Sequence, residues 1–520
     1  MLRKYRSLFI SALVLSALSG SVGDAVSQPV WSEPVKLTRN ERAELLITDD
    51  GKGFYTAVLD NTRSDVFKLS YFVLPDAHLA FQQTIEVPGG EEGKQEFSAL
   101  CYQKGGGLLL FTTKMDAEKD SYDAYVTRLD QLGKAVEGPM LVHSVPSEEK
   151  TNASWFEYEF SPDSVNFLVY FNTAYKRKAG EKIRLRTYNM DFELLWRKDL
   201  ELPYTEDVVQ VNRCLVDNRG DAYLLSGEAP KKERSTTEDL PAREGRYVLF
   251  HYRWQENRLK EFDVSLKEKT IASMVAVIQG SGKVSLSGLY SDDFRRTVSG
   301  TFLFTINPVD DKVETAAMAA FPKEFVGEVL SQKAAEKGLM LQDFYLDHVI
   351  ADPSGNLLLC AEQFFISEKI TQDPVTGRQQ VDYQRNHNDI IVVLLKPDGG
   401  PAWYSHIPKR QVASGQDRYN SYNIFRDEGG YSIYFNDDPD NSAYIPAPDG
   451  PEPKSYYGER NGVTTRMRMS STGALTRSTL FNNKTLGFTL VPQLGSSIPQ
   501  GMRVLAAEDS KVLKYVVVQD

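Results

Sequence analysis

The sequence predicts an all-β chain of repeated four-stranded antiparallel units, and two observations lead to this fold class. First, one hairpin pattern recurs: an alternating apolar strand, a tight Asp/Gly turn and a second alternating strand, as in 208–226, 345–361 and 420–435. Second, another hairpin follows each of these, for example 389–406 or 464–480. Two hairpins make one four-stranded unit, and units that repeat every 50 to 70 residues or so are typical of a β-propeller.

The turn signals divide the chain into consecutive units of similar pattern. These full units span about 40–89, 92–146, 150–203, 205–266, 268–322, 340–409 and 415–482.

The two ends of the chain complete the pattern. The tail 484–520 contains three strands, and Trp31–Leu37 is an isolated strand before the first unit. If this N-terminal strand becomes the outer strand of the last unit, the propeller closes with eight blades and leaves no open sheet edge. Seven blades remain the alternative.

Composition and charge limit the classes of protein and partner. The 520 residues are 41% hydrophobic and 11% aromatic, which is enough for a large packed core. The formal net charge of −11 argues against nucleic-acid binding, which depends on Lys and Arg contacts to phosphate. No Pro- or Gly-rich linker divides 28–520, so we expect one domain; two or three separate β-sandwiches are the alternative.

The N-terminus has the layout of a secretory signal. Basic residues at 3, 4 and 6 precede the apolar run Leu8–Leu18, and small residues at 25–27 offer a cleavage site before Gln28. We therefore expect residues 1–27 to be a signal peptide and the mature protein to be periplasmic or extracellular. An uncleaved membrane anchor is the alternative, and no later segment is expected to span a membrane.

Three cysteines, Cys101, Cys214 and Cys360, all fall in predicted strands. They are too few for a disulfide framework, and their spacing fits no metal site. We expect them to be free thiols that pack as small apolar side chains.

Two turns resemble a known structural motif. Asp398–Trp403 and Asp191–Trp196 are similar to the tryptophan-docking turns of quinoprotein-like eight-bladed propellers, which share their repeat plan with WD40-like propellers. The resemblance implies that each Trp packs between neighbouring blades, and that Trp31 takes a similar place. The stretch Asp398–Trp403 also resembles an Asp box of sialidase-like propellers. Both motifs are structural turns in their families, so the resemblance implies a fold and no activity.

The long connections are predicted to lie at one end of the blades. Strands one and two, and three and four, are joined by short turns, whereas long connections join strands two and three or successive units. Long loops on a rigid scaffold are frequent binding sites, although surface loops also tolerate insertions without a function. The long connections are 172–181, 228–245, 323–341, 366–388 and 437–463, of which 323–341 has helical spacing of its apolar residues.

The connection 437–463 offers a candidate calcium site. Asp437, Asp438 and Asp440 are clustered carboxylates, and Ca²⁺ prefers six to eight oxygen ligands. The spacing matches no EF-hand loop, and such Asp-rich stretches are also common in plain turns. No other cofactor is expected, because the vicinal cysteine pair of quinone-dependent dehydrogenases is absent.

Aromatic and polar side chains on two neighbouring connections form the candidate ligand-binding site. Tyrosine and arginine side chains can stack on sugar rings or anchor a protein partner. They can equally fasten long loops to the scaffold. The candidates are Tyr383, Arg385, His387, Tyr444, Tyr456 and Tyr457.

No catalytic motif is recognisable. The six histidines show no HExxH spacing, and the chain has no GxSxG elbow or phosphate-binding loop. His348 and Asp347 lie in a predicted innermost strand and could face the central channel, although a single strand His is more often structural. Asp and Glu are abundant, and a glycosidase needs only two at the right separation.

Three hypotheses of function follow. The leading one is an exported, non-enzymatic propeller that binds a glycan or a protein through the end that carries the insertions. The second is a polysaccharide-active hydrolase or lyase that uses Asp or Glu at the same end. The third is a structural scaffold of a cell-envelope assembly.

Overall fold

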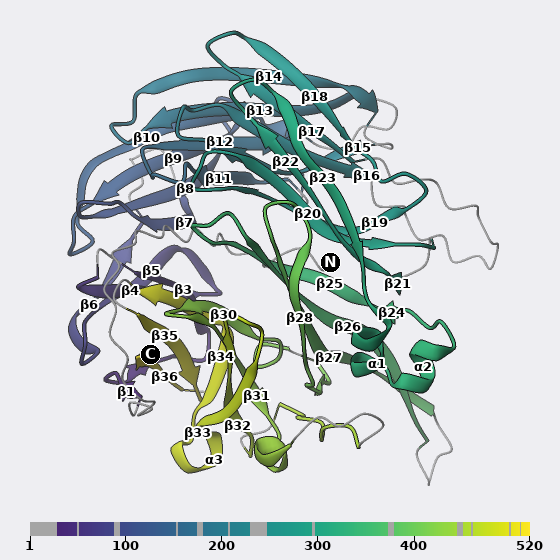
Figure 1. Ribbon diagram of the computed structural model, residues 1–520. Coiled ribbons are helices and arrows are strands. Elements are labelled where there is room, and N and C mark those ends of the chain that lie inside the picture. The colour runs from purple at the N-terminus through teal and green to yellow at the C-terminus, as the bar shows by residue number, and fades with distance from the viewer. Residues whose placement is uncertain are drawn as a thin grey trace.

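The structure is a computed structural model (Figure 1). None of its helices in the described ranges is long and apolar enough to cross a membrane. The expected signal peptide, 1–27, lies outside these ranges. The described residues are 29–48, 51–87, 94–151, 154–173, 180–205, 209–228, 247–293, 297–372, 379–415, 417–444, 451–458, 461–498, 501–509 and 511–519.

Antiparallel sheets of four strands follow one another along the chain, as the repeats predict. The strands of the first four sheets are β3 (Glu41–Thr48), β4 (Gly53–Asp60), β5 (Arg63–Val73) and β6 (His78–Glu86); β7 (Glu96–Tyr102), β8 (Leu108–Asp116), β9 (Ser121–Leu129) and β10 (Ala135–Pro146); β11 (Phe156–Phe160), β12 (Asn166–Asn172), β13 (Gly180–Asn189) and β14 (Leu194–Thr205); and β15 (Val209–Val216), β16 (Ala222–Glu228), β17 (Tyr247–Arg253) and β18 (Arg258–Val264).

The next three sheets repeat this order, and the sixth carries an extra short strand, β29, on the edge of β27. Their strands are β19 (Thr270–Ile278), β20 (Val284–Ser291), β22 (Gly300–Asn307) and β23 (Lys312–Ala320); β25 (Phe344–Ala351), β26 (Leu357–Gln372), β27 (Gln379–Leu395), β28 (Pro401–Ile407) and β29 (Gln411–Ala413); and β30 (Asn423–Asp427), β31 (Gly430–Asp437), β32 (Val463–Ser470) and β33 (Leu475–Asn482).

The eighth sheet joins the two ends of the chain. It contains β34 (Thr489–Ile498), β35 (Met502–Glu508) and β36 (Val512–Gln519), and β1 (Val30–Trp31) and β2 (Val35–Lys36) both pair with β36. The expected pairing of the N-terminal strand is therefore present. None of the described sheets closes on itself, and closure of the ring through this strand stays a prediction.

The helices are short and lie outside the sheets. The segment expected to form one helix forms two, α1 (Lys323–Val329) and α2 (Gln332–Glu336), because the Ser331 side chain caps α2 by accepting a hydrogen bond from the backbone N–H of Ala334. The pair of strands β21 (Thr297–Val298) and β24 (Leu341–Gln342) brackets them. The remaining short elements are η1 (Ser147–Glu149), η2 (Pro439–Ala443) and α3 (Asn483–Leu486).

Apolar side chains on both faces of each sheet build the core. In β8, Leu108 and Leu110 pack toward the first sheet, whereas Leu109 and Phe111 pack toward the third. All four are fully buried. Each of the eight hydrophobic clusters is shared by two successive sheets. This alternation across a strand with two buried faces explains the continuous apolar runs in the sequence.

The last sheet packs against the first in the same way. Tyr515 of β36 makes edge-on contacts with Phe54 and Phe72 of the first sheet, at ring-centroid distances of 5.3 and 5.1 Å. Figure 1 accordingly places the yellow strands β34–β36 beside the purple strands β3–β6. Eight sheets of four or five strands packed in this succession make the protein a β-propeller.

The recurring Asp/Gly turns have one hydrogen-bonding pattern. The Asp217 carboxylate accepts hydrogen bonds from the backbone N–H groups of Arg219 and Asp221, both at 2.9 Å. The Asp352 carboxylate makes the same contacts two and four residues further on, at 2.8 and 2.9 Å. Gly220 and Gly355 then adopt left-handed backbone conformations, with φ of 81° and 85°. Asp and Gly are required for different reasons, one as an acceptor and one for its backbone freedom.

The tryptophan-docking resemblance is confirmed for two turns. The indole N–H of Trp196 donates to the carbonyl of Gly220 in the following sheet, and that of Trp403 donates to Ser471 in the following sheet, both at 2.8 Å. Trp31 also lies at a sheet junction, but it packs on Phe481 of the preceding sheet, with ring centroids 5.0 Å apart. The three cysteines are free; Cys214 and Cys360 are buried, and Cys101 is partly buried.

Gly473 combines a left-handed backbone with a docked tryptophan, so its replacement tests both. In Gly473→Ala, the new methyl group would lie 2.8 Å from Trp403 Cδ2 at a φ of 83°. Gly282→Ala is the matched control, since φ there is 81° and no atom lies within 4 Å of the new methyl group. We expect Gly282→Ala to cost about 1 kcal/mol of folding free energy through backbone strain alone. Gly473→Ala should cost clearly more in denaturant titrations; equal losses would mean that the docked indole contributes nothing.

Candidate functional site

The strand order places the long connections at one end of the sheets. In a four-stranded antiparallel sheet, the link between the second and third strands leaves from the same end as the link to the next sheet. The five long connections are all of these two kinds. Most of 228–245 and the middle of 172–181 lie outside the described residues. Of the connections 366–388 and 437–463, the structure describes 366–372, 379–388, 437–444, 451–458 and 461–463.

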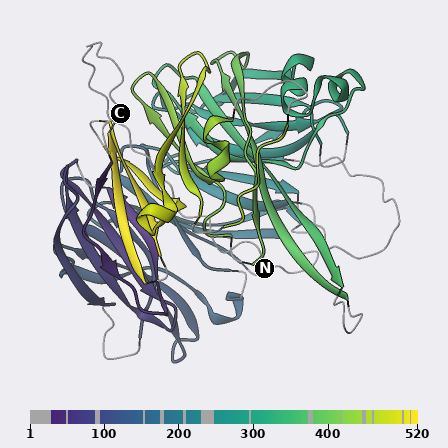
Figure 2. The ribbon, with the colours of Figure 1, turned by 90° about the horizontal axis from the view of Figure 1, so that it is seen from below.

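The connection 366–388 is a β-hairpin rather than a loop. The neighbouring strand β25 pairs with β26 only as far as Gln363, and β28 pairs with β27 only from Ile390 onward. Beyond these points, 366–372 and 379–385 pair with each other, and β29 covers only the base of β27. We call these two segments the arm. In Figure 2 it is the long green hairpin that projects away from the sheets at the lower right.

The outer face of the arm is apolar. The facing pairs Ile366–Arg385, Glu368–Tyr383 and Ile370–Val381 lie on it. The exposed fractions of the side chains are 48% for Ile366, 61% for Ile370, 43% for Val381 and 62% for Tyr383.

The opposite face of the arm is polar. It carries the facing pairs Ser367–Gln384, Lys369–Asp382 and Thr371–Gln380, of which Ser367, Gln384 and Asp382 are half-buried. The four apolar side chains of the outer face are thus as open to water as the polar residues Lys369, Thr371 and Gln380, which is unusual for apolar residues. A contiguous exposed apolar row is typical of an interaction surface.

A buried cluster of charged side chains anchors the base of the arm. Lys409 is fully buried, and its ammonium group donates to Glu362 Oε1 at 2.7 Å, to the His387 carbonyl at 2.7 Å and to Gln411 Oε1 at 3.0 Å. His387 Nδ1 lies 2.8 Å from Glu362 Oε2, and its Nε2 lies 3.6 Å from Asp417 Oδ2. A buried ammonium group is tolerated only when it is paired in this way.

The segment between β29 and β30, which we call the connector, contacts the arm and the first and eighth sheets. Arg385 of the arm donates to the carbonyl of Gly415. Arg418 Nε pairs with Glu508 Oε1 of the eighth sheet at 2.6 Å, and its Nη2 donates to the Ala43 carbonyl of the first sheet at 3.1 Å. The arm base is thus linked to the junction between the last and first sheets.

The cluster shifts the pKa values of its members in opposite directions. Burial disfavours the charged form of His387, but its contacts with the carboxylates of Asp417 and Glu362 outweigh this effect and raise its pKa. Burial of Glu362 is likewise outweighed, by the Lys409 charge and by His387, and the pKa of Glu362 is lowered. At mildly acidic pH, His387 is therefore a cation held between two carboxylates.

The three aspartates of the expected calcium site have different partners. Asp437 is buried, pairs with Arg477 and accepts a hydrogen bond from Asn441 Nδ2 at 2.8 Å. Asp438 caps η2 by accepting from the backbone N–H of Asp440, whose own carboxylate pairs with Lys454. In the described ranges, no group of three or more His, Cys, Asp or Glu side chains is arranged to hold a metal ion. The calcium site stays a prediction that these contacts do not support.

The tyrosines of the expected ligand site fall into two groups. Tyr456 is only 3% exposed, and its backbone pairs with Arg410 and Val412 beside β29. The Tyr444 hydroxyl donates to the Pro451 carbonyl at 3.1 Å, so both residues fasten the connection 437–463. Tyr383 and Tyr457 are each 62% exposed and can contact a partner.

His348 has structural contacts. Its ring packs edge-on against Tyr422 at a centroid distance of 5.2 Å, and burial lowers its pKa to about 4. The Tyr422 hydroxyl donates to Asp347 Oδ2 at 3.4 Å. His348 is therefore neutral at physiological pH, which fits the structural interpretation of this strand His.

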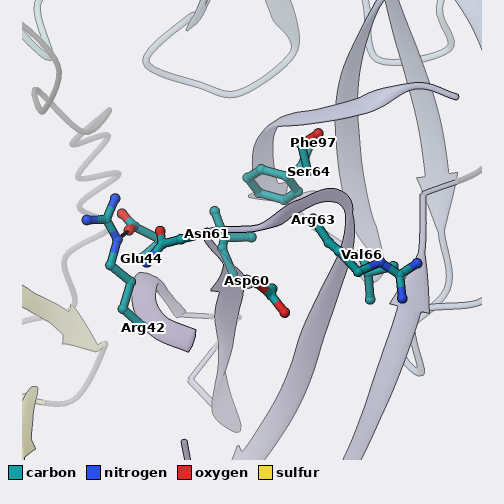
Figure 3. A pocket seen from close by; sticks show the side chains of 9 residues that line it. Arg42, Glu44, Asp60, Asn61, Arg63, Ser64, Val66 and Phe97 are labelled. Carbon is teal, nitrogen blue, oxygen red and sulfur yellow. Dashed lines mark ion pairs between the residues drawn. The ribbon is translucent and has the colours of Figure 1, made fainter. Parts of the chain in front are cut away.

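A small cavity lies beside the first two sheets, where the sequence predicted no site. Its volume is about 220 Å³, and Arg42 and Glu44, which form an ion pair, line it together with the turn Asp60–Ser64 and Phe97. Figure 3 shows Arg42 and Glu44 side by side next to this turn, with the Phe97 ring above it. The cavity offers charges of both signs and no recognisable catalytic arrangement.

Sequence reasoning found His387 but missed Glu362, Lys409 and Asp417. Glu362 follows the buried apolar run Leu357–Ala361, and an acidic residue in such a strand is a signal of a buried partner. Lys409 and Asp417 gave no comparable local signal.

The ion pairs of His387 should make stability depend on pH. A raised pKa stabilises the fold fully below the ordinary His value of 6.5, and this contribution is lost as pH rises through the folded pKa. The Glu362 contribution is present above its ordinary value of 4.5 and is lost as pH falls through its lowered pKa. We expect His387→Gln to lower the melting temperature more at about pH 5.5 than at about pH 8.5. His78→Gln, at a side chain that is 65% exposed, is the control, and an equal loss at both pH values would contradict the assignment.

Tyr456 and Tyr457 should differ sharply in their effect on stability. Tyr456→Ala removes a buried ring and should cost about 3 kcal/mol in denaturant titrations. Tyr457→Ala removes an exposed ring and should change stability by about 0.5 kcal/mol or less. Similar losses for both variants would show that Tyr456 does not fasten its connection.

Comparison with known proteins identifies no family. No family model and no curated protein matches the chain. Among solved structures, the Dos1 propeller is 10% identical, with a TM-score of 0.43, and the match covers 94% of each chain. A europium-containing methanol dehydrogenase is 8% identical, with a TM-score of 0.43, over 92% of this chain and 93% of that one. The uncharacterized protein lmo1340 from Listeria monocytogenes is 11% identical, with a TM-score of 0.36, over 80% and 91%. All three TM-scores are below 0.5, and the assignment as a β-propeller rests on the succession of sheets described above.

Proposed function

We propose that this protein is an exported, non-catalytic β-propeller that binds a protein partner through the end carrying the long connections, with the arm as the main contact. One observation carries the proposal: the arm exposes four apolar side chains, Ile366, Ile370, Val381 and Tyr383, on one face. Leaving such a row in water has a free-energy cost that binding removes. Export rests on the N-terminal sequence pattern alone.

The side chains of the arm favour a protein over a glycan. Sugars are commonly bound against flat aromatic rings, whereas three of the four exposed apolar side chains of the arm are aliphatic. Of the tyrosines on the neighbouring connection, Tyr456 is buried and Tyr444 is hydrogen-bonded to its own loop. Aliphatic and aromatic side chains in one row are suited to packing against another protein.

The carboxylates beside the arm give little support to a hydrolase or lyase. Glu362 is held by Lys409 and His387, and its lowered pKa keeps it ionised, so it is a poor general acid. Asp417 also has a lowered pKa, with His387 as the main cause. Their ion pairs fix the direction of the arm instead.

Site-specific photo-crosslinking in the source cells tests the proposal. Benzoylphenylalanine in place of Tyr383 should give a crosslinked protein adduct, identified by mass spectrometry. The same probe in place of Gln384, which lies next in sequence on the polar face, should give little of it. Combining the Tyr383 probe with Ile370→Glu and Val381→Glu should remove the adduct, because a charge on each strand would disrupt an apolar contact.

Two results would reject the proposal. One is the same adduct from both probe positions, since the contact would not then depend on the outer face. The other is a polysaccharide that raises the melting temperature equally with and without the two Glu substitutions, since the ligand would then be a glycan bound elsewhere.

A further inference from the structure

We infer that the partner on the arm is a second copy of this chain, with two arms packed face to face about a two-fold axis. This inference rests on the proposed function, because it names the occupant of the same surface. A two-fold contact requires one patch that is complementary to itself. The outer face of the arm meets this requirement, since its exposed row consists of apolar side chains that pack equally well against copies of themselves.

The geometry of the arm suits such a contact. Ile370 and Val381 face each other across the two strands, with Ile366 and Tyr383 nearer the base, so the row runs along both strands. Two such two-stranded faces can stack at the usual sheet separation of about 10 Å. A hairpin of two strands is only marginally stable in water, and a second hairpin on its apolar face would supply the missing layer.

Charge also favours a second copy over a strongly charged partner. The outer face carries Glu368 and Arg385, and the polar face carries Lys369 and Asp382, so the charges of the arm sum to zero. Two arms therefore do not repel each other, although the whole chains, at −11 each, do. A contact of this kind should strengthen as salt screens the repulsion between the two chains, whereas binding to a basic partner would weaken.

The contacts at the base of the arm fix its orientation before any partner binds. Glu362, Lys409 and His387 hold it through buried hydrogen bonds, and Arg385 is bound to the Gly415 carbonyl. Little conformational entropy is then lost when the arm binds. The patch is small, at the low end of interface sizes, so we expect a weak dimer with a dissociation constant in the micromolar range.

Sedimentation velocity of the purified protein tests the inference. We expect the mean mass to rise from one chain toward two between about 1 and 200 μM, and to rise further when sodium chloride is raised from about 50 to 300 mM. The double variant Ile370→Glu/Val381→Glu should stay monomeric. The matched control Thr371→Glu/Gln380→Glu places the same charges on the neighbouring facing pair of the opposite face and should still dimerise.

The outcomes separate this inference from the proposed function. A monomer at every concentration and salt, or a dimer that both variants retain equally, would overturn the second copy as the occupant. If the wild type is monomeric and the Tyr383 probe still captures another protein in an arm-dependent way, the proposed function stands with a different partner. If that arm-dependent adduct is absent as well, both proposals fail.

Discussion

Each sheet of this propeller has two apolar faces, and the rest of the structure depends on keeping both away from water. A sheet buried on one side only would expose half of its apolar residues, such as Leu109 and Phe111 of β8 or Leu108 and Leu110 of the same strand. In the eight hydrophobic clusters, each sheet buries one apolar face against the sheet before it and the other against the sheet after it. The indole N–H groups of Trp196 and Trp403 each donate a hydrogen bond to the following sheet and so add a polar link between successive sheets.

The arm departs from this arrangement, and its base shows how the departure is supported. Between Gln363 and Ile390, the short strand β29 pairs with the base of β27 at 385–387, and neither β25 nor β28 covers the described part of the arm. Ion pairs support the base of the arm, with Lys409 fully buried against Glu362 and His387. Buried ion pairs require precise geometry, and they therefore define one direction for the arm more sharply than apolar contacts would.

The sequence predicted the sheets well because their signals are local. An Asp side chain that accepts hydrogen bonds two and four residues ahead, followed by a left-handed Gly, is visible within five residues, as in Asp217–Asp221. The candidate site was predicted only in part, because its contacts join residues far apart in sequence. Lys409 meets Glu362 across 47 positions. Tyr456 is buried because it pairs with Arg410 and Val412, which no pattern near Tyr456 indicates.

The junction between the first and last sheets is held by more than its own strands. β1 and β2 contribute two residues each to the pairing with β36. Arg418, from the connector between the sixth and seventh sheets, binds Glu508 on one side of this junction and Ala43 on the other. A residue that is distant in sequence from both ends of the chain therefore links the first and last sheets. Cleavage within β1 and β2 would therefore leave the Arg418 contacts between the first and last sheets in place.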